Sequence, residues 1–427
     1  MVNESDSLTP ASGSASGNSA QMPQLPDINA ETYPFDVVLH FLDQAAILNT
    51  ISVPSRSGGG GIRSGGGITG IDVQESLHGL RVAVDQPSRE KGLSARRQVG
   101  QKVASSHHRW LMIPDSFQAS PDRLPPETVF DSSRSQRFAM YGGVIRFGEG
   151  KDGFHGFGSG KTFPISTGGQ TRLLAGAVGT ITEGFGGFSG KQGTYTYFGF
   201  LDPEKGFSGN LVIRVVDPKG DLLADSVPAM TNIQDPQPGM TYINFRGQKK
   251  SRNSKTRYVF KPDGVMEGFS LEQELRAVDV RFTTHGRDGG LLSSTKIGQV
   301  IGHMNSLVFL NLLDPTAPPG TPLAPIPFGS RNEFTFTDGS GSPVGGFTAE
   351  GGEGRTFHVQ FPGAPGQQAL RFGAFQAVTK GTGVLAGAQG YMTDNSIVGV
   401  APHATSTYYT LCLVDPDGRY QAALGGG

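Results

Sequence analysis

The segment GSGKTF at residues 158–163 returns later in the chain as GEGRTF at residues 352–357. A second block, VDPKG at residues 216–220, returns as VDPDG at residues 414–418. Between these blocks, small residues recur at a constant spacing: Gly176, Ala177, Thr182, Gly184, Gly186, Gly190, Gln192 and Gly193 match Gly373, Ala374, Thr379, Gly381, Gly383, Gly387, Gln389 and Gly390. Blocks repeated in the same order indicate a duplicated unit, which predicts two similar modules in tandem.

The composition favours β-structure. The chain has 427 residues, enough for two domains with hydrophobic cores, and it holds 64 glycines and 27 phenylalanines but a single tryptophan. Glycine spread among Thr-, Val-, Phe- and Tyr-rich stretches is typical of short strands joined by tight turns. We interpret the repeated glycines as turn and barrel-corner residues. The predicted fold class is mainly β, with two tandem antiparallel β-barrels, a β-containing insert and a partly disordered N-terminal region.

The repeat and the local patterns divide the chain into five parts. Residues 1–30 are rich in Ser, Gly, Asn and Pro and are predicted to be a disordered tail. Residues 31–136 are predicted to hold a helix that begins after Pro34, then a Gly-rich linker over 55–67 and a surface strap. The first β-barrel is predicted at 137–230, an insert or linker at 231–327 and the second barrel at 328–421.

Charge and cysteine content exclude several classes of protein. The formal net charge is −1, so no field over the whole chain attracts nucleic acid, and no nucleic-acid partner is expected. No apolar stretch reaches the length of a membrane span, and no secretory signal opens the chain, so no membrane partner and a cytoplasmic location are expected. The single Cys412 removes a disulfide framework within the chain. No metal-ligand spacing is present, and neither a metal nor another cofactor is expected.

Two stretches of the second copy carry a resemblance to a known superfamily. The sequence GSGSPVGGF at residues 339–347 and VTKGTGVLAGAQG at residues 378–390 resemble the allene oxide cyclase and dirigent superfamily. The first copy matches more loosely, with GFGGFSGKQG at residues 184–193. The resemblance implies a closed barrel whose apolar lumen holds a reactive hydrophobic small molecule and steers its cyclisation or coupling without a cofactor.

Alternation along the strands of the first copy supplies candidate site residues. Tyr195 and Tyr197 share one strand face. Arg214 stands in an apolar strand: if it points inward it needs a carboxylate partner such as Glu183, and if it points outward it is an ordinary surface arginine. Tyr195, Tyr197, Arg214 and Glu183 are the catalytic candidates. Phe157, Phe188, Phe198 and Asn210 are the candidates for substrate binding. A register slip of one residue would turn each side chain to the opposite face, so alternation alone leaves open which of them point inward. The aromatic-rich first copy is the expected active barrel.

Three functions remain open from the sequence. The first is a cofactor-independent cyclase or isomerase that folds a polyene, polyketide or terpenoid intermediate in a barrel lumen. The second is a non-catalytic carrier of a hydrophobic ligand. The third is a structural or assembly protein whose barrels are filled by their own side chains, and self-association into a homo-oligomer is left open.

Overall fold

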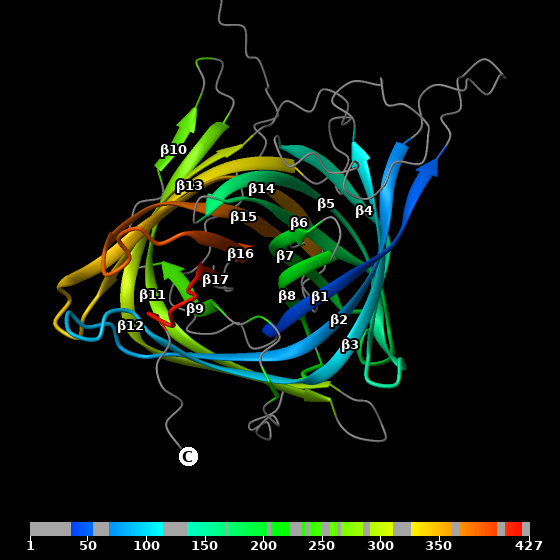
Figure 1. The fold of residues 1–427 in the computed structure, drawn as a ribbon, viewed down its shortest axis with the longest axis horizontal. Helices are drawn as coiled ribbons and strands as arrows, with labels where there is room; N and C mark the ends of the chain where they lie inside the picture. The colour runs from blue at the N-terminus through cyan, green and yellow to red at the C-terminus, as the bar shows by residue number, and fades with distance from the viewer. Residues whose placement is uncertain are drawn as a thin grey trace, which may run out of the picture.

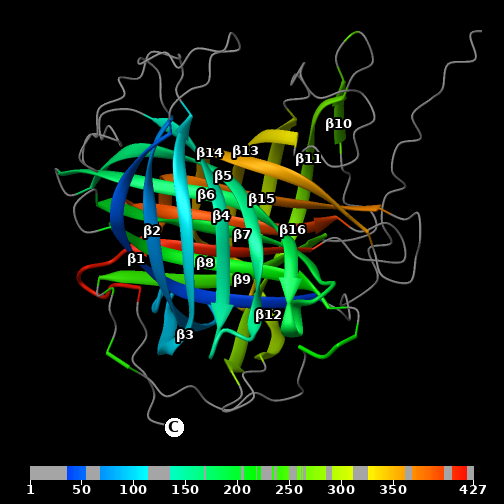
Figure 2. The ribbon, with the colours of Figure 1, turned by 90° about the vertical axis from the view of Figure 1, so that its right-hand side faces the viewer.

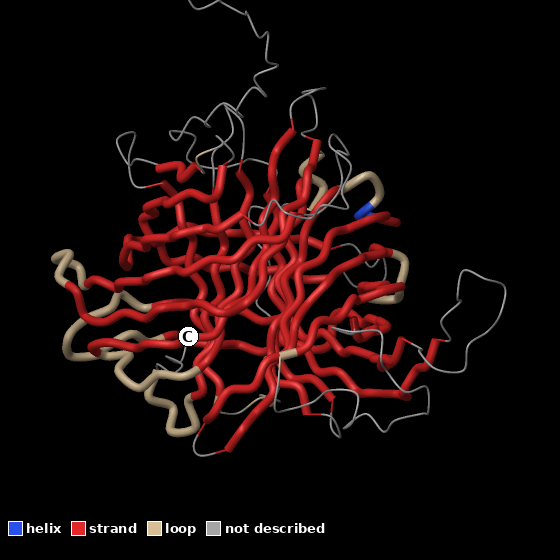
Figure 3. The backbone as a smooth tube through the Cα atoms, turned by 90° about the horizontal axis from the view of Figure 1, so that it is seen from above, coloured by secondary structure: helices blue, strands red, loops and turns tan. Residues whose placement is uncertain are grey.

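The computed structural model describes residues 36–53, 68–113, 135–167, 170–202, 206–217, 219–222, 233–234, 237, 239–249, 257–260, 262, 266–284, 291–310, 326–360, 368–398 and 406–420. The predicted disordered tail at 1–30 and the Gly-rich linker at 55–67 lie outside these residues. The described part is almost entirely β-strand, with one short 3-10 helix at Gly186–Phe188 (Figure 3). None of its helices is long and apolar enough to cross a membrane.

The first half of the chain forms a closed antiparallel barrel in which each strand pairs with the next and β1 pairs with β8. Figure 2 shows this barrel facing the viewer. Its strands are β1 (Asp36–Val53), β2 (Ile68–Val84), β3 (Ala95–Ile113), β4 (Gln136–Phe147), β5 (Asp152–Thr167), β6 (Gln170–Phe185), β7 (Gln192–Asp202) and β8 (Gly206–Val216).

The second half forms a sheet of nine strands that also returns on itself, because β9 pairs with both β17 and β11. Only β10 stands outside this ring, paired with β11. Its strands are β9 (Met240–Lys249), β10 (Arg257–Phe260), β11 (Met266–Thr284), β12 (Leu291–Leu310), β13 (Ile326–Thr337), β14 (Pro343–Gln360), β15 (Gln368–Gly383), β16 (Gly390–Val398) and β17 (Ser406–Val414). The predicted mainly β chain with two tandem barrels is confirmed.

The strand registers extend the repeat over the whole of both barrels. Lys161 lies opposite Gly176 in the first barrel, and their repeat partners Arg355 and Gly373 lie opposite each other in the second. The same correspondence equates β1 with β9 and β2 with β11. The predicted boundaries are therefore wrong: residues 137–230 cover only β4–β8 and residues 328–421 only β13–β17. The supposed strap and insert supply the first strands of each barrel.

The predicted N-terminal helix is also wrong, because β1 occupies that stretch. The apolar residues of this stretch fit a helical period only if His40 and Asp43, which are buried in the structure, are taken as a solvent-facing polar side. In the barrel, Val37, Leu39 and Phe41 point to the lumen, while Val38 and Leu42 pack on the other face of the strand. A strand buried on both faces reads as a continuous apolar run, which cannot be told from a buried helix by periodicity alone.

The two barrels lie side by side, with β2 of the first next to β11 of the second and β7 next to β15 and β16 (Figure 1). At this boundary, residues meet their own repeat partners. Arg81 and Asp279 hold equivalent positions on β2 and β11, and Arg81 Nε lies 2.9 Å from Asp279 Oδ1. Other contacts occur twice with the two barrels exchanged. The Thr194 hydroxyl donates a hydrogen bond to Asn395 Oδ1. The repeat partners of these two residues, Tyr391 and Phe198, pack on each other.

This reciprocity is the property of an isologous interface, in which the same patch of two subunits is self-complementary. The boundary is therefore packed as a two-fold dimer of one barrel would be, within a single chain. Two equivalent glycines, Gly176 on β6 and Gly373 on β15, allow the barrels to approach this closely. A Cβ at Gly176 would overlap the ring of Phe375, and a Cβ at Gly373 would overlap Val178.

Candidate functional site

The lumen of the first barrel holds a group of polar side chains among apolar ones. They are carried by four strands that are not all neighbours: β1, β2 and β3 on one side and β7 on the other. Alternation along these strands places each of them on the face that carries Phe41, Leu77 and Trp110, which all belong to the lumen core. We call this group the lumen cluster, and it consists of Asp43, Glu75, Ser106, His108, Tyr195 and Tyr197, all buried.

Glu75 is the centre of the cluster. His108 Nε2 lies 3.2 Å from Glu75 Oε2, and the hydroxyl of Ser106 donates a hydrogen bond to the same oxygen. The two residues reach Glu75 from β3, where Ser106 lies directly opposite it in the antiparallel register. The carboxylate of Glu75 is thus held in one orientation by groups on the adjacent strand.

The environment shifts the pKa values of the two carboxyl groups in opposite directions. Burial, followed by the negative charge of Glu75, raises the pKa of Asp43 well above its usual value. Burial acts on Glu75 in the same sense, but the charge of His108 and the hydrogen bonds from His108 and Ser106 outweigh it and lower its pKa. The surroundings thus favour the protonated form of Asp43 and the ionised form of Glu75.

The two tyrosines complete the cluster from β7. Burial, followed by the charges of Asp43 and Glu75, raises the pKa of Tyr197 well above its usual value, so Tyr197 keeps its proton beside both carboxyl groups. Burial and the charge of Glu75 raise the pKa of Tyr195 beyond the usual range as well. Both hydroxyls remain neutral donors at any physiological pH.

Two buried polar atoms of the cluster, Nδ1 of His108 and the hydroxyl of Tyr195, have no hydrogen-bond partner among the described residues. The Tyr197 hydroxyl hydrogen-bonds the carboxyl groups of Asp43 and Glu75. Buried polar groups are nearly always hydrogen-bonded in folded proteins, and each exception calls for a bound molecule or a role in chemistry. Here the exceptions converge in one lumen.

Glycines in the surrounding strands make room for the cluster. A Cβ at Gly179 would overlap the ring of Tyr195, and Gly156 and Gly158 also approach that ring closely. A Cβ at Gly143 would overlap the imidazole of His108. These glycines lie within strands, so our interpretation of the repeated glycines as turn residues holds for only some of them. It is confirmed at Gly186 and Gly190, whose positive φ values recur at Gly383 and Gly387.

Aromatic rings pack on one another in the rest of the lumen. Trp110 stacks on Phe138 with ring centroids 4.8 Å apart, and Tyr197 stacks on Phe207 at 4.1 Å. Trp110 also meets Tyr197 edge-on at 5.5 Å, so the aromatic packing reaches the lumen cluster itself. The polar cluster is thus set in an apolar, aromatic surround that excludes water.

The predicted site residues separate into three groups. Tyr195 and Tyr197 lie in the lumen, and Phe188 packs on Phe147 and Phe154 in the same core. Phe198 and Asn210 are buried on the opposite strand face, at the boundary with the second barrel. Glu183 is exposed and Phe157 is 42% exposed, which places both outside the lumen.

Arg214 is buried, but its expected pairing with Glu183 is wrong. Its guanidinium donates to the carbonyl oxygens of Asn395 and Ser406 and to the Ser406 hydroxyl, all in the second barrel. In return, Arg371 of the second barrel donates to the carbonyl oxygen of Arg214. Arg214 thus joins the two barrels.

Sequence reasoning missed Asp43, Glu75 and His108. Asp43 fell in the helix expected after Pro34, and Glu75 and His108 fell in the supposed surface strap. Strand alternation was therefore not applied to these three residues. A signal was present all the same. In LHFLD at residues 39–43 and VQESL at residues 73–77, every second residue is apolar except for one acidic residue, Asp43 or Glu75. The acidic residue therefore shares the strand face of the apolar ones.

The second barrel replaces every titratable member of the cluster at its equivalent position. Gly247 stands for Asp43, Gln273 for Glu75, Ser306 for His108 and Asp394 for Tyr197, as the matching registers show. In the second lumen, the Tyr409 hydroxyl donates to Gln273 Oε1 at 2.7 Å, and the Gln273 amide donates to Thr407 at 3.2 Å. Among these four replacements only Asp394 is titratable, so the pair of carboxyl groups in the first lumen is not repeated in the second.

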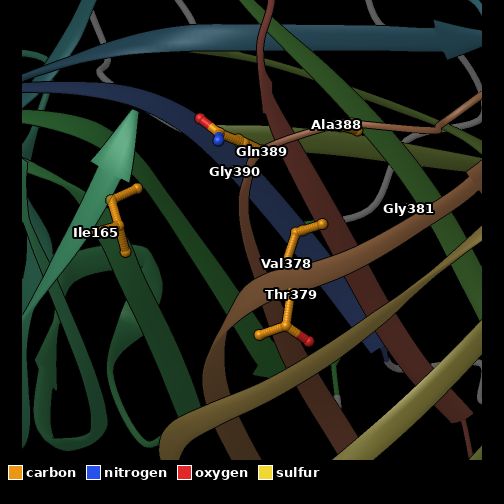
Figure 4. Close-up of a pocket in the computed structure, with 8 residues that line it drawn as sticks. Ile165, Val378, Thr379, Gly381, Ala388, Gln389 and Gly390 are labelled. Carbon is orange, nitrogen blue, oxygen red and sulfur yellow. The ribbon is translucent and has the colours of Figure 1, made fainter. Parts of the chain in front are cut away.

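A surface pocket of about 370 Å³ lies where the two barrels meet at β5 and β15 (Figure 4). Ile165 of the first barrel faces residues of β15 and of the turn before β16: Val378, Thr379, Gly381, Gly387, Ala388, Gln389 and Gly390. No titratable side chain lines it, so it lacks the groups for acid–base chemistry. Within the described residues, no cluster of three or more His, Cys, Asp or Glu is arranged to hold a metal ion.

Comparisons with known proteins leave the chain without a family. No family model matches it, and no curated protein matches it. Among solved structures, it is similar to a protein of unknown function of the DUF3598 family from Nostoc punctiforme, with 13% identity over 79% of this chain and 95% of that chain. The TM-score of 0.13 is too low for that likeness to carry an argument about fold or function.

Proposed function

We propose that the first barrel is a cofactor-independent isomerase or cyclase that acts by proton transfer on a hydrophobic molecule held in its lumen. The observation that carries this proposal is the buried pair of Asp43 and Glu75 in one lumen, with surroundings that move their two pKa values in opposite directions. Two titratable groups whose pKa values are pushed apart form a ready acid and base. The resemblance to the allene oxide cyclase and dirigent superfamily supports the same substrate class, a polyene, polyketide or terpenoid intermediate.

In the proposed reaction, Asp43 donates its proton to a carbonyl oxygen of the substrate while Glu75 removes a proton from the adjacent carbon. The product of this step is an enol, with Asp43 now ionised and Glu75 protonated. Transfer of the proton from Glu75 to a different carbon, while the enol O–H returns its proton to Asp43, completes an isomerisation. Alternatively, the enol carbon attacks an electrophilic C=O or conjugated C=C carbon of the same molecule and closes a ring. The π bond that breaks takes up the proton from Glu75, and the enol O–H returns its proton to Asp43. Tyr197, which faces both carboxyl groups, can pass the proton back between them.

The other residues of the cluster have supporting roles. His108 and Ser106 hold the Glu75 carboxylate in place and balance its charge. Tyr195 offers a neutral hydroxyl to a developing oxyanion, and the loss of one such donor costs about 100- to 1,000-fold in rate. The aromatic surround supplies the apolar contacts that hold a folded substrate conformation.

The test measures proton transfer directly. The purified chain is incubated in D₂O with a panel of uncharged polyene, polyketide and terpenoid carbonyl compounds, and deuterium uptake is followed by mass spectrometry. We expect uptake with the wild type, a loss of about 100-fold or more in Asp43→Asn and Glu75→Gln, and no effect of EDTA. Ser306→Ala, at the position equivalent to His108 in the second barrel, is the matched control and should keep the wild-type rate. Unchanged uptake in both carboxyl variants, or a loss with EDTA, would refute the mechanism.

The aromatic stacking favours a second candidate function, a structural barrel filled by its own side chains. A non-catalytic carrier is the third. Binding without deuterium uptake would identify a carrier. Failure of every compound to bind would leave the filled barrel as the function of the first half.

A further inference from the structure

The second barrel contains a buried carboxyl group that the proposed acid–base reaction does not use. Asp394 on β16 lies opposite Tyr409 on one side and Ala374 on the other, and only 8% of it is exposed. The backbone N–H of Ala374 hydrogen-bonds its carboxylate, while Oδ1 has no hydrogen-bond partner among the described residues. An acceptor is therefore left open inside the second barrel.

The surroundings of Asp394 combine apolar walls with a chain of neutral polar groups. Tyr409, directly across from it, stacks on Phe245 with ring centroids 5.3 Å apart and meets Phe334 edge-on at 5.3 Å. A chain of hydrogen bonds runs from the Tyr409 hydroxyl to Gln273 and from the Gln273 amide to the Thr407 hydroxyl. Ser396, two residues after Asp394 on β16, donates to the same Thr407 hydroxyl at 2.8 Å. Asp394 is the one carboxyl group among these residues, and no base accompanies it.

We propose that the second barrel is a binding site for an apolar molecule that ends in a hydrogen-bond donor, a protonated amine or a hydroxyl. Such a donor completes the hydrogen bonding of Asp394 Oδ1, and an amine adds a charge-assisted bond to the carboxylate. Burial raises the pKa of Asp394 to about 7, so the ligands are compared above that pH, where Asp394 is ionised. A ligand that ends in a carboxylate is then excluded, because it would set two negative groups together in a desolvated lumen. Since the acid–base positions of the first barrel are Gly247, Gln273 and Ser306 here, the site binds and does not transfer protons.

The test compares ligands that share one chain and differ at the end group. Hexylamine, hexan-1-ol and hexanoic acid are titrated into the full chain by calorimetry. We expect hexylamine or hexan-1-ol to bind at least about tenfold more tightly than hexanoic acid, the scale of one hydrogen bond to a charged group. Preference for the amine identifies a cationic ligand, and equal binding of amine and alcohol identifies a hydroxyl ligand.

The variants place the site. Asp394→Asn should weaken hexylamine binding about tenfold or more, and Glu183→Gln, which changes an exposed carboxylate of the first barrel, should leave it unchanged. The wild-type comparison among the three ligands stands even if Asp394→Asn fails to fold. Equal binding of all three ligands, binding of none, or full hexylamine binding in a folded Asp394→Asn variant would overturn the proposal. Deuterium uptake in the first barrel is a separate readout, so either proposal can fail alone.

Discussion

His40 and Asn244 occupy the same position in the two barrels, and their side chains meet: His40 Nδ1 lies 2.9 Å from Asn244 Nδ2. The amide nitrogen of Asn244 can only donate, so Nδ1 of His40 is the acceptor, as in a neutral imidazole. Burial, followed by the charge of Arg97, lowers the pKa of His40 to about 3. Because His40 and Asn244 are repeat partners in direct contact, the pair lies on the pseudo-two-fold axis that relates the barrels. The hydrogen bond between them helps to fix how the barrels dock.

The neutral His40 predicts a loss of stability in acid. The folded protein takes up this proton only near pH 3, whereas the unfolded chain takes it up near pH 6.5, so the stabilisation is complete above pH 6.5 and is lost as the pH falls toward 3. His40→Asn should flatten the pH dependence of the free energy of unfolding in that window, by a slope of up to about 1.4 kcal/mol per pH unit. Urea unfolding from pH 3 to 8 measures it; parallel curves for the two proteins would contradict the prediction.

Asp394 predicts the opposite trend. Burial raises its pKa to about 7, against 3.8 as the ordinary value, so the folded protein keeps a proton that the unfolded chain has already released. The stabilisation is complete below about pH 4 and is lost as the pH rises to about 7. The difference in unfolding free energy between wild type and Asp394→Asn should therefore shift in favour of the variant across this window. A constant difference from pH 4 to 7 would show that the carboxyl group ionises normally in the fold.

The Arg81–Asp279 pair predicts a measurable coupling between the barrels. Arg81 binds both carboxylate oxygens of Asp279, through Nε at 2.9 Å and Nη2 at 3.0 Å, and both residues are partly exposed. A double-mutant cycle with Arg81→Ala and Asp279→Ala should give a coupling energy of about 1 kcal/mol, decreasing with added salt. Exposed Arg331 and Glu333, paired on a single strand at 3.0 Å, form the control cycle, with a smaller expected coupling. Equal coupling in both cycles would argue against a docking role.

Substitution of Gly179 tests how tightly side chains pack around Tyr195 in the first lumen. A Cβ there would overlap the ring of Tyr195, so Gly179→Ala should destabilise the fold by about 1 to 3 kcal/mol and displace the tyrosine. Gly339→Ala is the control, because nothing lies within 4 Å of its added Cβ. Thermal melts and the near-UV signal of the aromatic core measure both variants. Equal melting temperatures for the two variants would mean that the lumen has room around Tyr195.

The sequence by itself determined the duplication and the strand-rich character of the chain. The recurrence of GSGKTF, VDPKG and the glycine series required no contact information, because a repeat is a property of residue order. Alternation placed Tyr195 and Tyr197 on one strand face correctly, because it is local to a strand. The VDPKG repeat extends to hydrogen bonding: the carboxylate of Asp217 accepts from the N–H of Leu222, and that of its repeat partner Asp415 accepts from the N–H of Tyr420.

Only the tertiary structure decided which faces point inward and which strands close the rings. Arg214 and Tyr195 are equally buried, yet one joins the barrels and the other lines a lumen, because a strand between two cores is apolar on both faces and shows no alternation. Asp43, Glu75 and Tyr197 are far apart in the chain, and closure of β1 on β8 brings β7 within reach of β1 and β2. Proximity of this kind depends on long-range pairing. Short-range patterns do not encode it.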